Sequence, residues 1–309
     1  MQVDVLVHGS DLSAALIWYE LSRGGFNVIL AHRSMRVSER LAYIPFTTDW
    51  ARYIKWLGVD EFSEEHRILL KTSESFCGRF SPTIRVCIGD ARRLSERLFS
   101  VGEGRAEHWC KDVRWWKNDE DVEYVVLTRA GEELKGIAKL LIDTEYGKVT
   151  GGGIVIYTSL STAGNAILNL SEPSIHLTVP HSGLETHIQV GEEIGSITGL
   201  CRATLPLGKG VELGVMPLLY AGIRSGLVTP PWIGDCLAAS ALVSVKIVEN
   251  WMGGSDLSQN ILSYLTELTA RSNMFLDILR RAASGQIKEL ELTYLFEGLR
   301  PPPHPSCRL

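Results

Sequence analysis

The sequence lacks any long apolar segment. No run of uncharged apolar residues reaches the roughly 18 that a transmembrane helix needs. Met1 leads directly into an alternating strand pattern, without the basic stretch and apolar core of a signal peptide. These absences predict a cytoplasmic protein with no transmembrane segment, and they leave peripheral contact with a membrane surface open.

Paired cysteines and an excess of positive charge are also missing. The six cysteines are scattered without a Cys-x-x-Cys pair, so we expect reduced, buried thiols and neither a zinc site nor a disulfide framework. Asp and Glu (36) outnumber Lys and Arg (31), and the net charge of −5 argues against nucleic-acid binding. With 309 residues, 45% of them hydrophobic, the chain is long enough to bury a sizeable core.

The first thirty residues have the pattern of a strand–helix–strand unit. Residues 3–8 alternate and are rich in valine, residues 12–23 run at helical spacing, and residues 28–31 form a second apolar strand. The pair Gly24-Gly25 ends the helix. A unit of this length is typical of the start of a dinucleotide-binding domain.

The turn of this unit departs from the Gly-x-Gly-x-x-Gly fingerprint that binds a pyrophosphate. Gly9 keeps the first glycine, whereas Asp11 replaces the second and places a carboxylate where the phosphates would lie. Ala14 replaces the third glycine and still permits close packing of helix and strand. After the second strand, His32 replaces the acidic residue that holds the ribose, and Arg33 follows it.

The rest of the chain contains both helical and strand patterns. Helices are predicted near residues 49–57 and 90–99, over 233–252, and from about 255 toward 283, and strands near 108–116, 122–128 and 137–142. From Gly151 to about Leu213, turn signals at short intervals predict an antiparallel sheet with little helix. Residues 215–228 hold an apolar strand and a glycine-rich turn.

Four segments in this order resemble the FAD-dependent oxidoreductases of the p-hydroxybenzoate hydroxylase-like type, and most closely their geranylgeranyl reductase branch. They are the strand–helix–strand start, the helix IGDARRLSERL, the strand AKLLIDTEYG, and the segment AGIRSGLVTPPWIGDCLAASALVSVKIVEN. In the last segment, Gly222, Gly226 and Pro230 match two glycines and a proline of the family's Gly-Asp-Ala-Ala-Gly motif. The resemblance extends over almost the whole chain and implies FAD as the cofactor.

Several matched positions differ from the family residue that contacts FAD or substrate. The aspartate that holds the ribityl chain aligns with Ile223, which cannot make that hydrogen bond, and the FAD-contacting arginine aligns with Ala91, next to Arg92. Of the aromatic substrate motif, only Pro206 is kept, and Cys201 lies at its start. The residues that the resemblance places around FAD are Gly9, Ser10, Asp11, Ala14, His32, Arg33, Arg92, Gly222, Ile223, Gly226 and Pro230.

The resemblance implies an α/β fold. It consists of an FAD/NAD(P)-binding Rossmann-like domain with an inserted antiparallel β-sheet substrate domain and C-terminal helices. The boundaries we expect are 1–150 for the first part of the FAD-binding-like domain, with a small inserted segment at 34–80, 151–213 for the substrate-type sheet, 214–254 for the return to the FAD-binding-like domain, and 255–309 for a helical segment and tail.

Two functions compete. In the first, an FAD-dependent oxidoreductase reduces a double bond of an isoprenoid or a similar apolar small molecule or lipid, and the cofactor carries the redox chemistry. In the second, a non-catalytic paralogue, or pseudoenzyme, has lost FAD binding and acts as a scaffold or protein partner of an active flavoprotein. Changes at Asp11, His32 and Ile223 together favour the second, because each lost hydrogen bond to a charged group costs about 1.5–3 kcal/mol. A third interpretation keeps a different nucleotide, whose phosphate meets His32 and Arg33.

The remaining polar residues give weaker signals. His176, His181 and His187 lie within twelve positions, but their spacings place no pair on one face of one strand, so we expect no metal site. Cys201 is more simply a buried thiol than a proton donor. The sequence identifies no catalytic acid or base.

Overall fold

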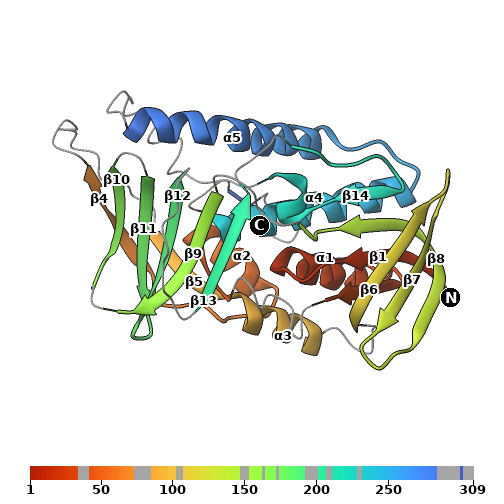
Figure 1. The fold of residues 1–309 in the computed structure, drawn as a ribbon. Coiled ribbons are helices and arrows are strands. Elements are labelled where there is room, and N and C mark those ends of the chain that lie inside the picture. The colour runs from red at the N-terminus through yellow and green to blue at the C-terminus, as the bar shows by residue number, and fades with distance from the viewer. Residues whose placement is uncertain are drawn as a thin grey trace.

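A computed structural model of the chain contains two β-sheets with helices between and above them (Figure 1). The residues that the structure describes are 1–33, 42–72, 85–101, 107–146, 153–161, 164–171, 174–191, 201–206, 211–227, 232–283 and 300–301. Figure 1 places the sheet that contains β1 and β8 at one end of the molecule and the sheet that contains β10 to β12 at the other. Helices α1 and α4 lie between the two sheets.

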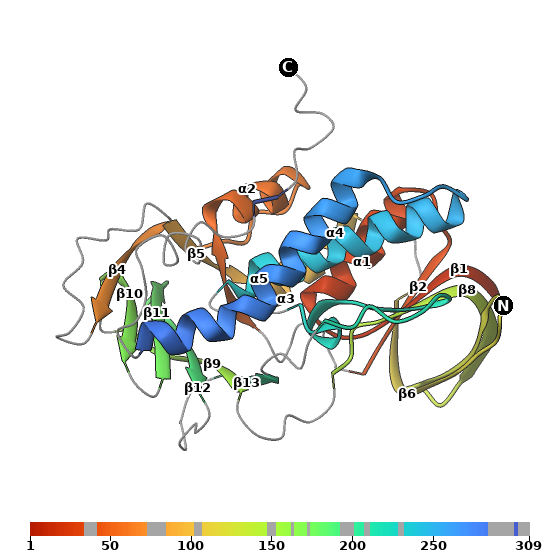
Figure 2. The same ribbon diagram turned by 90° about the horizontal axis from the view of Figure 1, so that it is seen from above.

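The first sheet starts from the strand–helix–strand unit that the sequence predicts. Its elements are β1 (Gln2–His8), α1 (Leu12–Arg23), β2 (Val28–His32), β6 (Glu107–Lys117), β7 (Val122–Thr128), β8 (Glu133–Asp143) and β14 (Leu218–Tyr220). Strand β1 pairs in parallel with both β2 and β8, and β2 continues to β6, so five strands close on themselves (Figure 2). This closed arrangement encloses a small apolar core of its own that includes Leu6, Tyr124 and Leu141.

The second sheet is larger than the predicted one. Its order is β13-β9-β12-β11-β10-β4-β5-β3, so three strands from residues 43–90 extend the sheet expected from 151–213. The strands are β3 (Tyr43–Thr47), β4 (His66–Thr72), β5 (Arg85–Asp90), β9 (Gly153–Leu160), β10 (Ala166–Ser171), β11 (Ser174–His181), β12 (Leu184–Gly191) and β13 (Cys201–Pro206). Neighbouring strands are antiparallel except β4 and β10, which are parallel.

Alternation of side chains gives this sheet one apolar and one polar face. Ile156, Leu177 and Ile188 lie in register on three neighbouring strands and belong to the main hydrophobic core. On each strand, the residues before and after these three point to the opposite face of the sheet, because successive side chains of a strand alternate. That opposite face carries Tyr157 and His187, which are paired in register.

The helices form close to the positions that the sequence predicts. They are α2 (Thr48–Trp56), α3 (Ala91–Val101), the short 3-10 helix η1 (Gly222–Ser225), α4 (Ile233–Met252) and α5 (Gln259–Ala283). Helix α1 packs against α3 and α4, and α5 crosses α4 and reaches β10 and β11 (Figure 2). Among the described residues, no helix is both long enough and apolar enough to cross a membrane.

Helix α4 is also tied to β3 by a buried polar contact. Asp235 in its first turn accepts hydrogen bonds from the backbone N–H and the hydroxyl of Thr47, at 2.9 and 2.7 Å. Both residues are buried, and burial raises the pKa of Asp235 well above its ordinary value. The contact joins the C-terminal part of the chain to the start of α2.

Candidate functional site

The turn between β1 and α1 is occupied by a carboxylate of the chain itself. Asp11 is the N-cap of α1, and its Oδ1 accepts hydrogen bonds from the Ala14 N–H at 2.9 Å and from the Ser13 hydroxyl at 2.6 Å. The first N–H groups of a helix have no partner within the helix and attract anions. Asp11 therefore supplies an internal anion at the position where a dinucleotide fold receives phosphates.

Burial changes the acid–base behaviour of this carboxyl group. Asp11 is only 5% exposed, and the Thr144 side chain interacts with its carboxyl group in addition to Ser13 and Ala14. Burial raises the pKa of Asp11 to about 6, because the charged form loses its hydration. At neutral pH the turn therefore holds a poorly solvated negative charge.

The chain segments around this turn lie very close together. Gly222 has a φ of +57°, and a Cβ atom placed on it would lie 2.2 Å from Ser13 Oγ and 2.8 Å from Asp11 Oδ2. A Cβ on Gly9 would lie 1.8 Å from Thr144 Oγ1. The structure thus brings Gly222 next to Asp11, which lies more than two hundred residues earlier in the sequence, but the side chains of Asp11 and Ser13 already lie against the Gly222 backbone.

The neighbouring side chains add further negative charge. Ser10 donates a hydrogen bond to Glu145 at 2.7 Å, and Asp143 lies 3.0 Å from the Nδ1 of His8. Glu145 follows the end of β8, which runs beside β1. An FAD pyrophosphate needs free N–H donors or cations, whereas this turn offers a capped helix and carboxylates. The residues present therefore do not fit a pyrophosphate.

The other residues predicted to contact FAD lie at the end of β2, on α3 and on η1. His32 and Arg33 end β2; His32 is 1% exposed, and Arg33 forms an ion pair with Asp112 at 3.2 Å. Arg92 lies on the surface of α3, 3.9 Å from Glu96. Ile223 is buried in the main core.

The remaining predicted positions lie at the end of η1, in α1, or outside the described part of the chain. Gly226 ends η1 with a φ of +75°, a left-handed conformation that glycine adopts without strain. Ala14 is buried in α1, where it packs against the core. Pro230 and the side chain of Cys201 lie outside the described residues.

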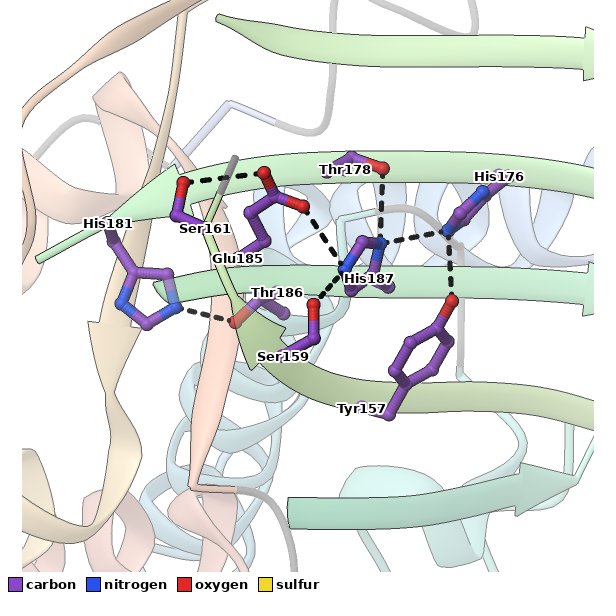
Figure 3. A network of polar contacts seen from close by, with 9 residues as sticks. All are labelled: Tyr157, Ser159, Ser161, His176, Thr178, His181, Glu185, Thr186 and His187. Carbon is purple, nitrogen blue, oxygen red and sulfur yellow. Dashed lines mark hydrogen bonds and ion pairs between the residues drawn. The ribbon is translucent and has the colours of Figure 1, made fainter. Parts of the chain in front are cut away.

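A second polar cluster lies on the polar face of the larger sheet (Figure 3). The Nδ1 of His187 lies 3.1 Å from the Nε2 of His176 and 3.2 Å from the Thr178 hydroxyl. The Nε2 of His187 lies 2.8 Å from the Ser159 hydroxyl and 3.4 Å from a Glu185 oxygen. Sequence reasoning missed this cluster because it compared positions along one strand, whereas the two histidines meet across β11 and β12.

The imidazole pair in this cluster is held neutral by its surroundings. The His187 ring stacks on Tyr157, with ring centroids 4.5 Å apart and planes inclined by 12°. Burial and, to a smaller extent, the neighbouring His176 lower the pKa of His187 to about 4; burial also lowers the pKa of His176. Each neutral imidazole carries one N–H, so a hydrogen bond between these two ring nitrogens has one ring as donor and the other as acceptor. Within the described residues, no group of three or more ligating side chains could hold a metal ion.

The fold, unlike the sequence, matches proteins of known structure. No family model and no curated protein sequence matches the chain. A probable FAD-dependent monooxygenase of Pseudomonas aeruginosa, pqsL, matches with a TM-score of 0.67 and 11% identity over 96% of this chain and 100% of its own. The flavin-dependent brominase Bmp2 matches with a TM-score of 0.68 and 12% identity over 97% of this chain and 94% of its own.

A structural relative of the predicted reductase type is also found. A geranylgeranyl bacteriochlorophyll reductase-like protein of Thermoplasma acidophilum matches with a TM-score of 0.63 and 11% identity, over 96% of this chain and 91% of its own. The chain therefore has the fold of the FAD-dependent monooxygenases and reductases, as the sequence resemblance predicts.

Proposed function

We propose that this protein, which has the fold of FAD-dependent oxidoreductases, works without FAD in its β1–α1 turn, as a non-catalytic scaffold or partner subunit of an active flavoprotein. The observation that carries the proposal is the Asp11 cap, which occupies the N-terminus of α1. A phosphate would have to displace this carboxylate and then lie beside Glu145 and Asp143. The fold would remain stable without the cofactor, because the main core is continuous from α1 to the larger sheet.

A second candidate function is supported by the structural likeness. The match to a geranylgeranyl bacteriochlorophyll reductase-like protein extends over 96% of this chain. It supports a flavin-dependent oxidoreductase, for which we propose a double bond in an isoprenoid or similar apolar molecule as the group that is reduced. This function requires FAD to bind in spite of Asp11, so measurement of FAD binding separates the two candidates.

The test is to purify the protein natively and measure its flavin absorbance, and then to titrate the protein into FAD while following flavin fluorescence. We expect a colourless protein and no change in FAD fluorescence up to high micromolar protein. The same titration with heat-unfolded protein serves as the control for non-specific quenching. A yellow protein, or saturable binding in the low micromolar range, would overturn the proposal in favour of the oxidoreductase.

If flavin is bound, a further experiment tests the second candidate directly. The bound flavin is photoreduced without oxygen and then mixed with an isoprenoid lipid that contains double bonds. Reoxidation of the flavin together with saturation of the lipid would identify a reductase. A flavin that stays reduced would argue against this substrate class.

A further inference from the structure

We propose that the N-terminus of α1 is a self-occupied anion site, in which the Asp11 carboxylate and the phosphate of a nucleotide compete for the same hydrogen-bond donors. This inference rests on the proposed function and gives the physical reason why the turn holds no FAD. The ligand class is a nucleotide with a diphosphate group. Asp11 is then the residue that decides whether the turn accepts such a ligand.

The hydrogen-bond donors at the start of α1 are already used by Asp11. Asp11 Oδ1 uses both the Ala14 N–H and the Ser13 hydroxyl, and the Ala15 N–H donates to the Asp11 carbonyl oxygen at 3.4 Å. A phosphate at this helix end would need the first two of these donors. The carboxylate and the phosphate therefore cannot be accommodated together.

The Asp11 carboxyl group is also enclosed by segments from distant parts of the chain. Its Oδ2 lies toward the backbone of Gly222, where a Cβ would approach it to 2.8 Å, and the Thr144 side chain interacts with it from the end of β8. A phosphate at this turn would therefore have to displace a buried group that is held from three sides.

The charged and titratable groups around Asp11 determine how pH acts on the competition. Glu145 acts on it from just after the end of β8, and the pair formed by His8 and Asp143 lies at the adjoining ends of β1 and β8. The first turn of α1 contains no acidic residue, and α4 contributes the Ser240 hydroxyl, which accepts a hydrogen bond from the Gly222 N–H. Protonation of Asp11 removes its charge from this acidic surrounding, so mild acid weakens the internal competitor.

The experiment measures ADP binding by isothermal titration calorimetry, because ADP tests the phosphate contact without the altered ribityl position at Ile223. We expect Asp11→Gly to bind ADP about 10- to 100-fold more tightly than the unmodified protein at pH 8, since two donors become free. Glycine is well tolerated at the N-cap of a helix, so the fold should persist. Circular dichroism checks the fold.

The matched control is Asp90→Gly. Asp90 accepts a hydrogen bond from the Arg93 N–H at 3.0 Å and so caps α3 in the same way, but away from the turn. We expect this variant to bind ADP as weakly as the unmodified protein. An equal gain in both variants, or no gain in Asp11→Gly, would overturn the inference.

Asp11→Asn and a second pH separate occupancy of the donors from charge. The amide oxygen still caps the helix, so we expect a smaller gain than with glycine, and equal gains would contradict competition for donors. At about pH 5 the affinity of the unmodified protein should approach that of Asp11→Asn, because the protonated carboxyl group, like the amide, still caps the helix, and the pH dependence of Asp11→Gly corrects for protonation of ADP. If Asp11→Gly shows no gain in ADP affinity, only this inference is contradicted, whereas FAD binding by the unmodified protein contradicts the proposed function.

Discussion

The two buried polar clusters of this protein respond to burial in opposite ways. In the β1–α1 turn, burial raises the pKa of the acid Asp11 to about 6; on the larger sheet, burial lowers the pKa of the base His187 to about 4. In both places a low-dielectric surrounding disfavours the charged form. The same physical effect therefore leaves one group charged and poorly solvated at neutral pH and the other neutral and well partnered.

This difference predicts opposite contributions to stability. The folded-state pKa of Asp11 lies above the unfolded value of 3.8, so its stabilising contribution is present at low pH and is lost as pH rises from about 4 to about 6. The folded-state pKa of His187 lies below the unfolded value of 6.5, so its contribution is present above that value and is lost as pH falls toward about 4. The two effects partly cancel between pH 4 and 6.

The largest effect is expected at Asp235, a buried carboxyl group like Asp11 whose two oxygens both accept hydrogen bonds from Thr47. Asp235→Ala removes both acceptors of Thr47 and leaves its N–H buried without a partner. We expect the free energy of unfolding to fall by about 2–4 kcal/mol, measured by urea denaturation at pH 7. Thr47→Val, which removes only the hydroxyl bond, should cost about half as much. Equal stability of Asp235→Ala and the unmodified protein would contradict a structural role for this contact.

Asp11→Asn should act in the opposite direction. It removes the buried charge and keeps an oxygen that can accept from the Ala14 N–H and the Ser13 hydroxyl. We expect the free energy of unfolding to rise by about 2 kcal/mol at pH 7 and to match the unmodified protein only below about pH 3, where Asp11 is protonated in both the folded and the unfolded state. Asp90→Asn, at an exposed cap, serves as the control and should change stability little. A loss of stability in Asp11→Asn at pH 7 would show that the turn requires the negative charge.

His187→Gln tests the other half of the comparison. The variant loses the stacking of the His187 ring on Tyr157. It also loses the imidazole whose pKa is lowered in the folded state, and with it the destabilisation that acid causes when this imidazole is protonated. Between pH 6.5 and pH 4, we expect the free energy of unfolding to fall by about 1–2 kcal/mol less in this variant than in the unmodified protein. This difference allows for the partial access of solvent to His187, which weakens the effect of burial. Chemical denaturation at several pH values measures this slope. An unchanged slope would assign the acid sensitivity to other groups.

The smallest effects are expected at the edges of the two clusters. Ser159→Ala removes one hydroxyl partner of His187 and should cost about 0.5–1.5 kcal/mol. Arg92→Ala removes an exposed side chain with a weak ion pair to Glu96 and should change thermal stability and ADP binding by less than the error of most measurements. A clear loss of nucleotide binding in Arg92→Ala would revive the predicted role of this arginine at the cofactor.

Much of the fold was predictable because its signals are local. The strand over residues 3–8, the helix over 12–23 and the helix over 233–252 follow from hydrophobic spacing, and they match β1, α1 and α4 within a residue. Cys87, Cys110 and Cys236 are buried, as expected. The Asp11 substitution was visible in the turn because the fingerprint defines what each position must do.

The histidine cluster was not predictable by the same means. His176 and His187 are eleven positions apart, and their contact depends on which strands pair and in which register. Along the sequence they show no common periodicity, since the turn between β11 and β12 reverses the chain direction. The contribution of β3, β4 and β5 to the larger sheet escaped prediction for the same reason.

The sequence by itself determined the local elements, the order of the dinucleotide-type unit and the presence of a carboxylate at its turn. Only the tertiary structure decided what that carboxylate does, because its partners come from α1, from the end of β8 and from Gly222 more than two hundred residues away. The physical reason is that helix and strand patterns depend on neighbours a few positions apart. The pKa of a buried group, in contrast, depends on every segment that excludes water from it.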